Sequence, residues 1–135
     1  LRLSNIFGFE PGRHTFMGHA LKTLKENNFI ALDIKETAFR DFLPVSIFSK
    51  SLDRVIENKL SGVFNLGSGL ETKVGDAARW IIKGFGSGEL HVHPQKEENS
   101  FVLNTKKLEN HVGHLCASED IRNSCINLGS QLQNG

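Results

Sequence analysis

Arg40 is the residue of this sequence whose side-chain chemistry is most specific. It lies in the run Phe39-Arg40-Asp41-Phe42-Leu43-Pro44-Val45. A guanidinium group keeps its charge at physiological pH, and its planar fork matches phosphate oxygens with two parallel hydrogen bonds. We therefore expect Arg40 to bind phosphate groups, and the alternative is a salt bridge to Asp41 or another acid. For Asp41, which would point the other way along a strand, we expect structural pairing or capping.

Three more side chains could belong to such a site. Asn5 carries amide donors and an acceptor, although an asparagine at a strand end can also satisfy its own turn. Lys96 offers phosphate a point charge without a fork, and its alternative is a solvated loop lysine beside Glu97 and Glu98. Phe42 either packs or stacks on a base, and packing is the expected role.

The remaining motifs favour structural roles. Residues 65–69, Asn-Leu-Gly-Ser-Gly, could cradle a phosphate, but a tight turn that needs glycine is the preferred interpretation. Gly84, Gly86 and Gly88 follow a predicted helix, whereas a dinucleotide fingerprint follows a strand. A metal site is not expected, because ligation needs three or four convergent ligands, and the histidines considered for it, four of the six in the sequence, are scattered at positions 91, 93, 111 and 114. The sequence contains no tyrosine, so this chain alone has no phenol for acid–base catalysis.

Alternating strands and helices would position these side chains. Hydrophobic spacing predicts helices over residues 15–28, 46–59, 74–83 and 118–133, with a further helix starting at 104–108. Strands are predicted over residues 1–7, 29–34, 39–45, 62–67, 89–93 and 101–103. Thr15 is expected to cap the first helix and Ser46 the second. This alternation predicts an α/β fold.

The composition excludes several classes of protein. The 135 residues include 39% hydrophobic and 23% charged side chains, which favours a folded domain over a disordered tail. A formal net charge of +1 argues against nucleic-acid binding as the main role. No apolar run approaches the length of a membrane span, and no signal peptide is visible. The two cysteines are therefore expected to be reduced, in a cytoplasmic protein.

Three segments, in this order, resemble the C-terminal half of the extended short-chain dehydrogenase/reductase family, the NAD-dependent nucleotide-sugar epimerases and dehydratases. Residues 1–8, Leu-Arg-Leu-Ser-Asn-Ile-Phe-Gly, are similar to the family pattern R-x-x-N-x-[YF]-G. Residues 40–45, Arg-Asp-Phe-Leu-Pro-Val, resemble R-D-[FY]-[IVL]-x-V. Residues 62–69, Gly-Val-Phe-Asn-Leu-Gly-Ser-Gly, resemble G-x-[YF]-N-[LI]-G-[ST]-G. The likeness extends over about residues 1–110.

The resemblance implies the last strands of a Rossmann-type parallel sheet plus a small α/β substrate-binding domain, truncated at the N-terminus. Residues 1–110 would form the substrate-binding part and residues 111–135 a C-terminal helical tail. The family's glycine fingerprint and its Tyr-x-x-x-Lys pair are not present in this sequence. The parent protein is accordingly expected to be a homodimer that uses NAD or NADP, bound mainly by an N-terminal half, and no catalytic residue is expected in this chain.

The resemblance also implies roles for individual residues. Asn5 would contact the nucleotide-sugar and Arg40 its phosphates, while Lys96 stands near the position where members often place an arginine. Ser4 would face the nicotinamide through its backbone. The strand that passes the nucleobase would include Leu32 and Asp33, and its alternative is a plain sheet strand. Thr15 and Phe16, at the helix start, are further candidates for substrate binding.

The function implied is the substrate-binding portion of an NAD(P)-dependent nucleotide-sugar epimerase or dehydratase, which holds the nucleotide diphosphate and positions the sugar for hydride transfer. Two alternatives stay open within this sequence. One is a keto-sugar reductase of the same family, and the other is a non-catalytic nucleotide-sugar-binding or assembly module. A Tyr-x-x-x-Lys pair in the adjoining sequence would separate the enzymes from the binding module.

Overall fold

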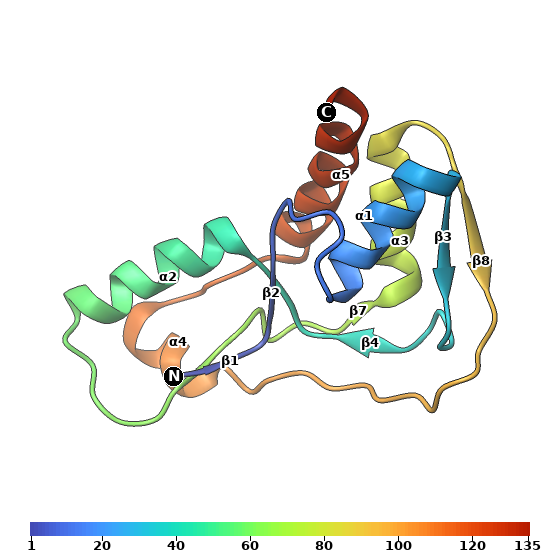
Figure 1. Ribbon diagram of the computed structural model, residues 1–135. Coiled ribbons are helices and arrows are strands. Elements are labelled where there is room, and N and C mark those ends of the chain that lie inside the picture. Colours follow the sequence, from blue (N-terminus) through green and yellow to red (C-terminus); the bar gives the residue numbers. More distant parts are fainter.

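The computed structural model describes residues 1–135 as eight short strands and five helices (Figure 1). In chain order they are β1 (Arg2–Leu3), β2 (Asn5–Phe7), α1 (Phe16–Asn27), β3 (Phe29–Leu32), β4 (Phe39–Arg40), β5 (Phe42–Pro44), α2 (Val45–Glu57), β6 (Asn65–Leu66), β7 (Thr72–Lys73), α3 (Val74–Phe85), β8 (Glu89–Val92), α4 (Lys106–Val112) and α5 (Ser118–Asn134). The alternation confirms the α/β class. No helix is both long and apolar enough to cross a membrane.

The strands form four pairs, of which three are parallel. β1 pairs with β6, β2 with β5, and β3 with β8, all in parallel register, whereas β4 and β7 are antiparallel. The segment of β1 and β2 therefore changes partner at Ser4, from β6 to β5. In the second parallel pair Asn5 lies opposite Phe42. This register brings the first resemblance motif beside the second, although more than 30 residues separate them in sequence.

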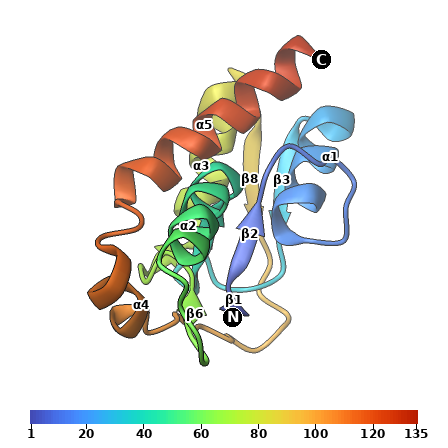
Figure 2. The ribbon, with the colours of Figure 1, turned by 90° about the vertical axis from the view of Figure 1, so that its left-hand side faces the viewer.

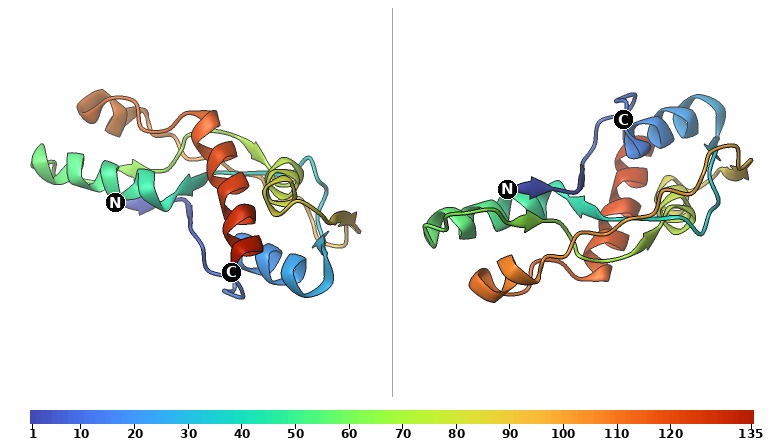
Figure 3. Two further views of the ribbon diagram at one scale, coloured as in Figure 1. Left: turned by 90° about the horizontal axis from the view of Figure 1, so that it is seen from above. Right: turned by 90° about the horizontal axis from the view of Figure 1, so that it is seen from below.

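The helices bury their apolar faces in one hydrophobic core. α1 contributes Met17, Leu21 and Leu24, at the spacing that one helix face requires. α5 crosses α3 at very short range (Figure 2), because Gly84 and Gly129 have no side chain at the crossing. Seen from above and below, α2 and α4 lie at one end of the molecule and α1, α3 and β8 at the other (Figure 3). The segment 111–135 thus shares its core with the rest of the chain through α5.

Local sequence explains the ends of α1. The Thr15 hydroxyl accepts a hydrogen bond from the Gly18 N–H at 3.0 Å, which confirms the predicted N-cap. Asn28 adopts a left-handed conformation with φ 60°, and its N–H donates to the Leu24 carbonyl. Asparagine tolerates this conformation better than most residues, so the helix ends where predicted.

Two local predictions were wrong, and one strand pair was not predicted. α2 begins at Val45, directly after Pro44, and no side chain caps it, so Ser46 lies inside the first turn. Residues 101–103 are not a strand, and the pair formed by β4 with β7 was not predicted. Pro44 has a fixed φ that suits the residue before a helix, and this outweighs the capping preference of serine.

A long segment without regular structure joins β8 to α4. We call residues 93–105 the strap, which runs along the lower edge of the molecule in Figure 1. The Gln95 and Lys96 N–H groups donate to the Asp33 carbonyl at 2.7 and 3.0 Å. Further along, the Ser100 hydroxyl accepts from the Phe39 N–H at 3.0 Å. These hydrogen bonds hold the strap against the ends of β3 and β4.

Candidate functional site

Arg40 is half-buried at the end of β4 and forms no ion pair. Its Nη1 donates to the Phe39 carbonyl at 3.0 Å, and no carboxylate lies within salt-bridge distance of the guanidinium. The neighbouring Asp41 carboxylate is bonded elsewhere, to the 67–69 turn and to the strap. The salt bridge considered from the sequence is therefore not formed. Most of the guanidinium donors stay free for an anionic ligand.

Two cavities meet at Arg40. The larger cavity has a volume of about 490 Å³ and the smaller cavity about 320 Å³. Arg40 and Phe16 line both cavities, so these two residues are shared between them. Volumes of 300 Å³ and more are typical of small-molecule sites. The arrangement suits a ligand with two bulky parts joined by an anionic group.

The larger cavity contains four of the predicted residues besides Arg40. Phe16 comes from α1, Leu32 and Asp33 from the end of β3, and Lys96 from the strap. Leu32 is buried, whereas the side chains of Asp33 and Lys96 are mostly exposed and form an ion pair at 3.0 Å. Lys96 is thus not merely a solvated loop lysine, because it pairs with Asp33.

Backbone recognition at the end of β3 is limited by the strap. The Leu32 carbonyl accepts from the His93 N–H at 2.9 Å, and the Asp33 carbonyl already accepts two hydrogen bonds. These bonds occupy the acceptors with which a strand edge could bind a nucleobase. A ligand in this cavity would therefore contact side chains of the strap.

The smaller cavity contains Asn5, Thr15 and Phe42 in addition to the two shared residues. The Asn5 side chain is exposed and makes no hydrogen bond within the chain, so the strand-end turn considered from the sequence is not formed. Thr15 accepts the capping bond described above and can still donate its hydroxyl proton. Phe42 is 1% exposed and forms the buried wall between Phe7 and Phe16, at ring-centre distances of 6.1 and 5.6 Å.

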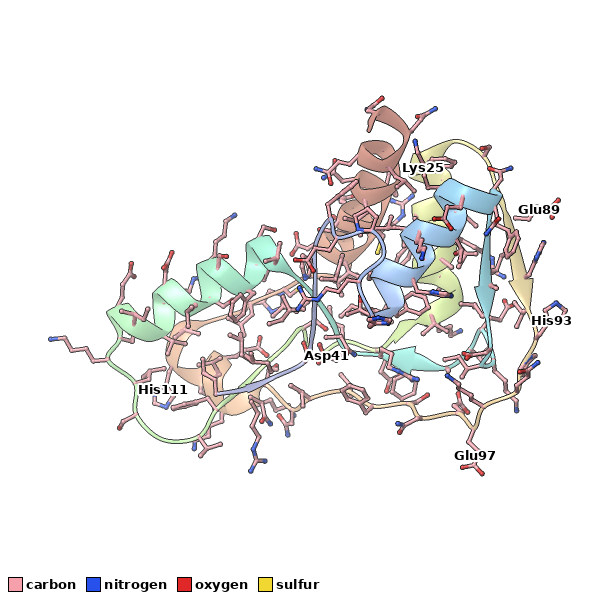
Figure 4. All side chains as sticks on the ribbon, in the orientation of Figure 1. Lys25, Asp41, Glu89, His93, Glu97 and His111 are labelled. Atoms are coloured by element: carbon pink, nitrogen blue, oxygen red, sulfur yellow. The ribbon has the colours of Figure 1, made fainter.

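Sequence reasoning missed three polar residues of the larger cavity, which are His19, His93 and Gln95. His19 lies three residues after Phe16 on α1, so helical spacing alone could have found it. His93 and Gln95 follow β8, and only the parallel pairing of β8 with β3 brings them to this cavity. Figure 4 shows His93 at the end of β8, where the strap begins.

Two features of the sequence bear on a dinucleotide site, Ser4 and the glycines at the end of α3. Ser4, the residue expected to face the nicotinamide, donates its N–H to the Leu66 carbonyl, and its buried Oγ has no hydrogen-bond partner. Gly84 and Gly86 end α3, where Gly86 has a φ of 93°, and lead into a strand rather than a helix. No group of three or more metal-ligating side chains comes together.

No protein-family model and no curated protein sequence matches the chain. Solved structures do share its fold. An NAD-dependent NDP-hexosamine 5,6-dehydratase, TunA, involved in tunicamycin biosynthesis, matches 98% of this chain and 44% of its own, with a TM-score of 0.79 and 18% identity. A UDP-N-acetylglucosamine 4-epimerase from Methanobrevibacter ruminantium M1, in complex with UDP-N-acetylmuramic acid, matches 99% and 46%, with a TM-score of 0.81 and 12% identity. RMD from Pseudomonas aeruginosa, in complex with NADPH, matches 98% and 47%, with a TM-score of 0.76 and 17% identity.

These likenesses establish the fold. At identities of 12 to 18%, they do not carry the activity of the matched proteins. The fold predicted from the three sequence motifs, that of extended short-chain dehydrogenases/reductases, is confirmed. The chain spans less than half the length of each of these proteins.

Proposed function

We propose that this chain, which has the fold of nucleotide-sugar epimerases and dehydratases over less than half of their length, binds a nucleoside diphosphate sugar. The diphosphate lies at Arg40, the nucleoside in the larger cavity and the sugar in the smaller cavity beside Asn5. The whole protein is then an NAD- or NADP-dependent nucleotide-sugar epimerase or dehydratase, to which this chain contributes the substrate-binding residues.

The observation that carries this proposal is the position of Arg40. A half-buried guanidinium without a carboxylate partner is uncommon, because arginine side chains that leave bulk water usually pair with an acid. Here Arg40 lines two cavities of different composition, and its guanidinium makes a single hydrogen bond, to the Phe39 carbonyl. A diphosphate fits a fork of parallel N–H donors, and its two substituents would occupy the two cavities.

The remaining cavity residues suit the two ends of such a ligand. Phe16 and Leu32 provide apolar surface in the larger cavity, against which a base or ribose can pack. Asn5 has unused amide donors and an acceptor for sugar hydroxyl groups in the smaller cavity. Phe42 supports this site from the core and makes its wall rigid.

The chemical contribution of this chain is to hold and orient the substrate. Correct placement of two reactants supplies several kcal/mol of the barrier reduction that enzymes achieve, roughly 7–11 kcal/mol in favourable cases. A binding surface is therefore part of catalysis even when it moves no proton. The nicotinamide, when bound by the whole protein, supplies the hydride chemistry.

Binding of uridine diphosphate and thymidine diphosphate, measured by titration calorimetry on the 135-residue chain, tests the proposal. Arg40→Ala should weaken binding by roughly 10- to 100-fold, the equivalent of losing hydrogen bonds to a charged group. Arg40→Lys should restore only part of the affinity, because an ammonium group lacks the planar fork.

Arg79→Ala is the matched control for this experiment. Arg79 is also an arginine, but it is exposed, pairs with Glu36 at 2.6 Å and lines neither cavity. Its loss changes the net charge equally and should leave the affinity unchanged. Equal affinities of the Arg40→Ala and Arg79→Ala variants would reject the proposed phosphate site.

A further inference from the structure

Asp41 has a completely buried carboxylate, with 0% of the residue exposed. No cation pairs with it. Instead its Oδ1 accepts from the Ser68 N–H at 2.8 Å and from the Ser68 hydroxyl at 2.9 Å. Its Oδ2 accepts from the Gly69 N–H at 3.0 Å and from the Leu103 N–H at 3.1 Å. Four donors offset the large cost of removing a carboxylate from water.

The 67–69 turn is shaped to receive this carboxylate. A Cβ at Gly67 would lie 2.9 and 3.0 Å from the two Asp41 carboxylate oxygens, so any side chain there would displace them. Gly69 adopts a φ of 69°, which glycine tolerates at little conformational cost, and its N–H donates to Oδ2. The glycines of this turn therefore make room for the Asp41 carboxylate and donate to it. This structural role explains the turn better than a phosphate-binding role does.

Asp41 is also bonded to segments that carry residues of both cavities. Its carbonyl accepts from the Asn5 N–H at 3.1 Å, and it directly follows Arg40 in sequence. Figure 4 shows Asp41 where the β1–β2 segment passes the end of β4. Through Leu103 its carboxylate holds the far end of the strap, whose near end carries His93, Gln95 and Lys96 into the larger cavity. One residue thus links the candidate ligand contacts of the two cavities.

We infer that Asp41 is a positioning residue, whose carboxylate holds Arg40 and the strap in the geometry that binds the ligand. The inference rests on the proposed function for its ligand. It goes beyond that function because Asp41 lines neither cavity and would touch no substrate. A residue that only stabilised the core would affect the free energy of unfolding and leave the affinity of the folded molecules unaltered.

Asp41→Asn tests this inference, because it keeps the shape of the side chain but turns amide donors toward backbone N–H groups. The expected result is an affinity for uridine diphosphate lower by about tenfold, an effect within the range of couplings between neighbouring groups. The effects of Asp41→Asn and Arg40→Ala should not add in the double variant, since Asp41 acts through Arg40. Additive effects, or an unchanged affinity of folded Asp41→Asn, would overturn the inference.

Amide hydrogen exchange supplies a readout that does not depend on any ligand. Asp41→Asn should raise the exchange rates of the strap amides of Lys96 and Leu103 and leave those of α5 unchanged. Strap rates equal to those of the unmodified chain would overturn the inference. If the unmodified chain fails to bind uridine diphosphate or thymidine diphosphate while Asp41→Asn still releases the strap, the proposed function fails and the positioning of the strap stands.

Ser68→Ala is the milder variant if Asp41→Asn does not fold. It removes one of the four donors to the carboxylate and keeps the three backbone bonds. Its affinity should fall in the same direction by a smaller factor. Ser51→Ala is the control, because Ser51 is likewise buried but donates only to the Ile47 carbonyl in α2. Equal affinities of these two variants would also contradict the role of Asp41.

Discussion

Lys96 Nζ lies 3.0 Å from Asp33 Oδ2, so an ion pair between two residues of the larger cavity ties the strap to the end of β3. The two side chains are 73% and 54% exposed. An ion pair in such an environment contributes little to stability, about 0–1 kcal/mol, because water screens it. Lys96 can therefore leave Asp33 for a phosphate group at small cost.

This ion pair predicts that Asp33 weakens the binding of a diphosphate. Asp33→Asn removes a negative charge from the cavity and frees Lys96, so the affinity for uridine diphosphate should rise by roughly two- to fivefold at low ionic strength. The gain should shrink as salt is added, because ions screen exposed charges. Titration calorimetry at two salt concentrations measures both effects.

Glu97→Gln is the control for the charge change. Glu97 lies on the same strap but projects away from the molecule (Figure 4) and lines neither cavity. The Glu97→Gln substitution alters the net charge by the same amount as Asp33→Asn. Identical affinities of the two variants would mean that the Asp33–Lys96 pair has no specific influence on the ligand.

The crossing of α3 and α5 predicts a large loss of stability on adding one methyl group. A Cβ at Gly129 would overlap the Ile81 carbonyl oxygen, which is backbone and cannot rotate away. Gly129→Ala should therefore lower the free energy of unfolding by at least about 1–3 kcal/mol, although alanine favours helices. Urea unfolding followed by the fluorescence of Trp80, the single tryptophan, measures this loss.

Gln131→Ala provides the comparison on the same helix, since Gln131 is exposed in α5. It should change the stability by less than about 0.5 kcal/mol. A Gly129→Ala variant as stable as Gln131→Ala would show that the helices separate without cost, contrary to the close crossing.

The two buried cysteines predict a fall of stability in alkaline solution. Burial raises the pKa of Cys125 from 9.0 to about 12, and burial together with the charges of Asp120 and Asp41 raises the pKa of Cys116 to about 12. The unfolded chain ionises these thiols above pH 9, whereas the folded chain keeps them protonated. The stability that the protonated thiols contribute is complete below pH 9 and is lost as the pH rises toward 12.

Cys125→Ala isolates this effect from the other groups that titrate in the same range. Between pH 8 and pH 10 the free energy of unfolding of the unmodified chain should fall by about 1 kcal/mol more than that of Cys125→Ala. Urea unfolding at the two pH values measures the difference. A constant gap between the two proteins would contradict the raised pKa of this thiol.

Much of the fold and part of the site could be predicted because the signals are local. The apolar spacing of α1, its Thr15 cap and the left-handed Asn28 act within a few residues of one another, so the sequence predicts both helix ends. The motifs around Asn5, Arg40 and residues 62–69 imply strands of a parallel sheet, but the structure alone shows which of these strands pair. The start of α2 was predicted wrongly, because Pro44 precedes the helix and two local preferences compete there.

The amino-acid sequence by itself determined the α/β class, the helices, and the identity of Arg40 and Asn5 as candidate ligand contacts. Only the tertiary structure decided that Arg40 has no acidic partner, that Lys96 pairs with Asp33, and that His93 and Gln95 enter the larger cavity. It also decided that Asp41 accepts hydrogen bonds from residues 27 to 62 positions away. Helix propensity and capping arise from neighbours along the chain, whereas the partner of a charged side chain depends on which distant segments the packing brings beside it.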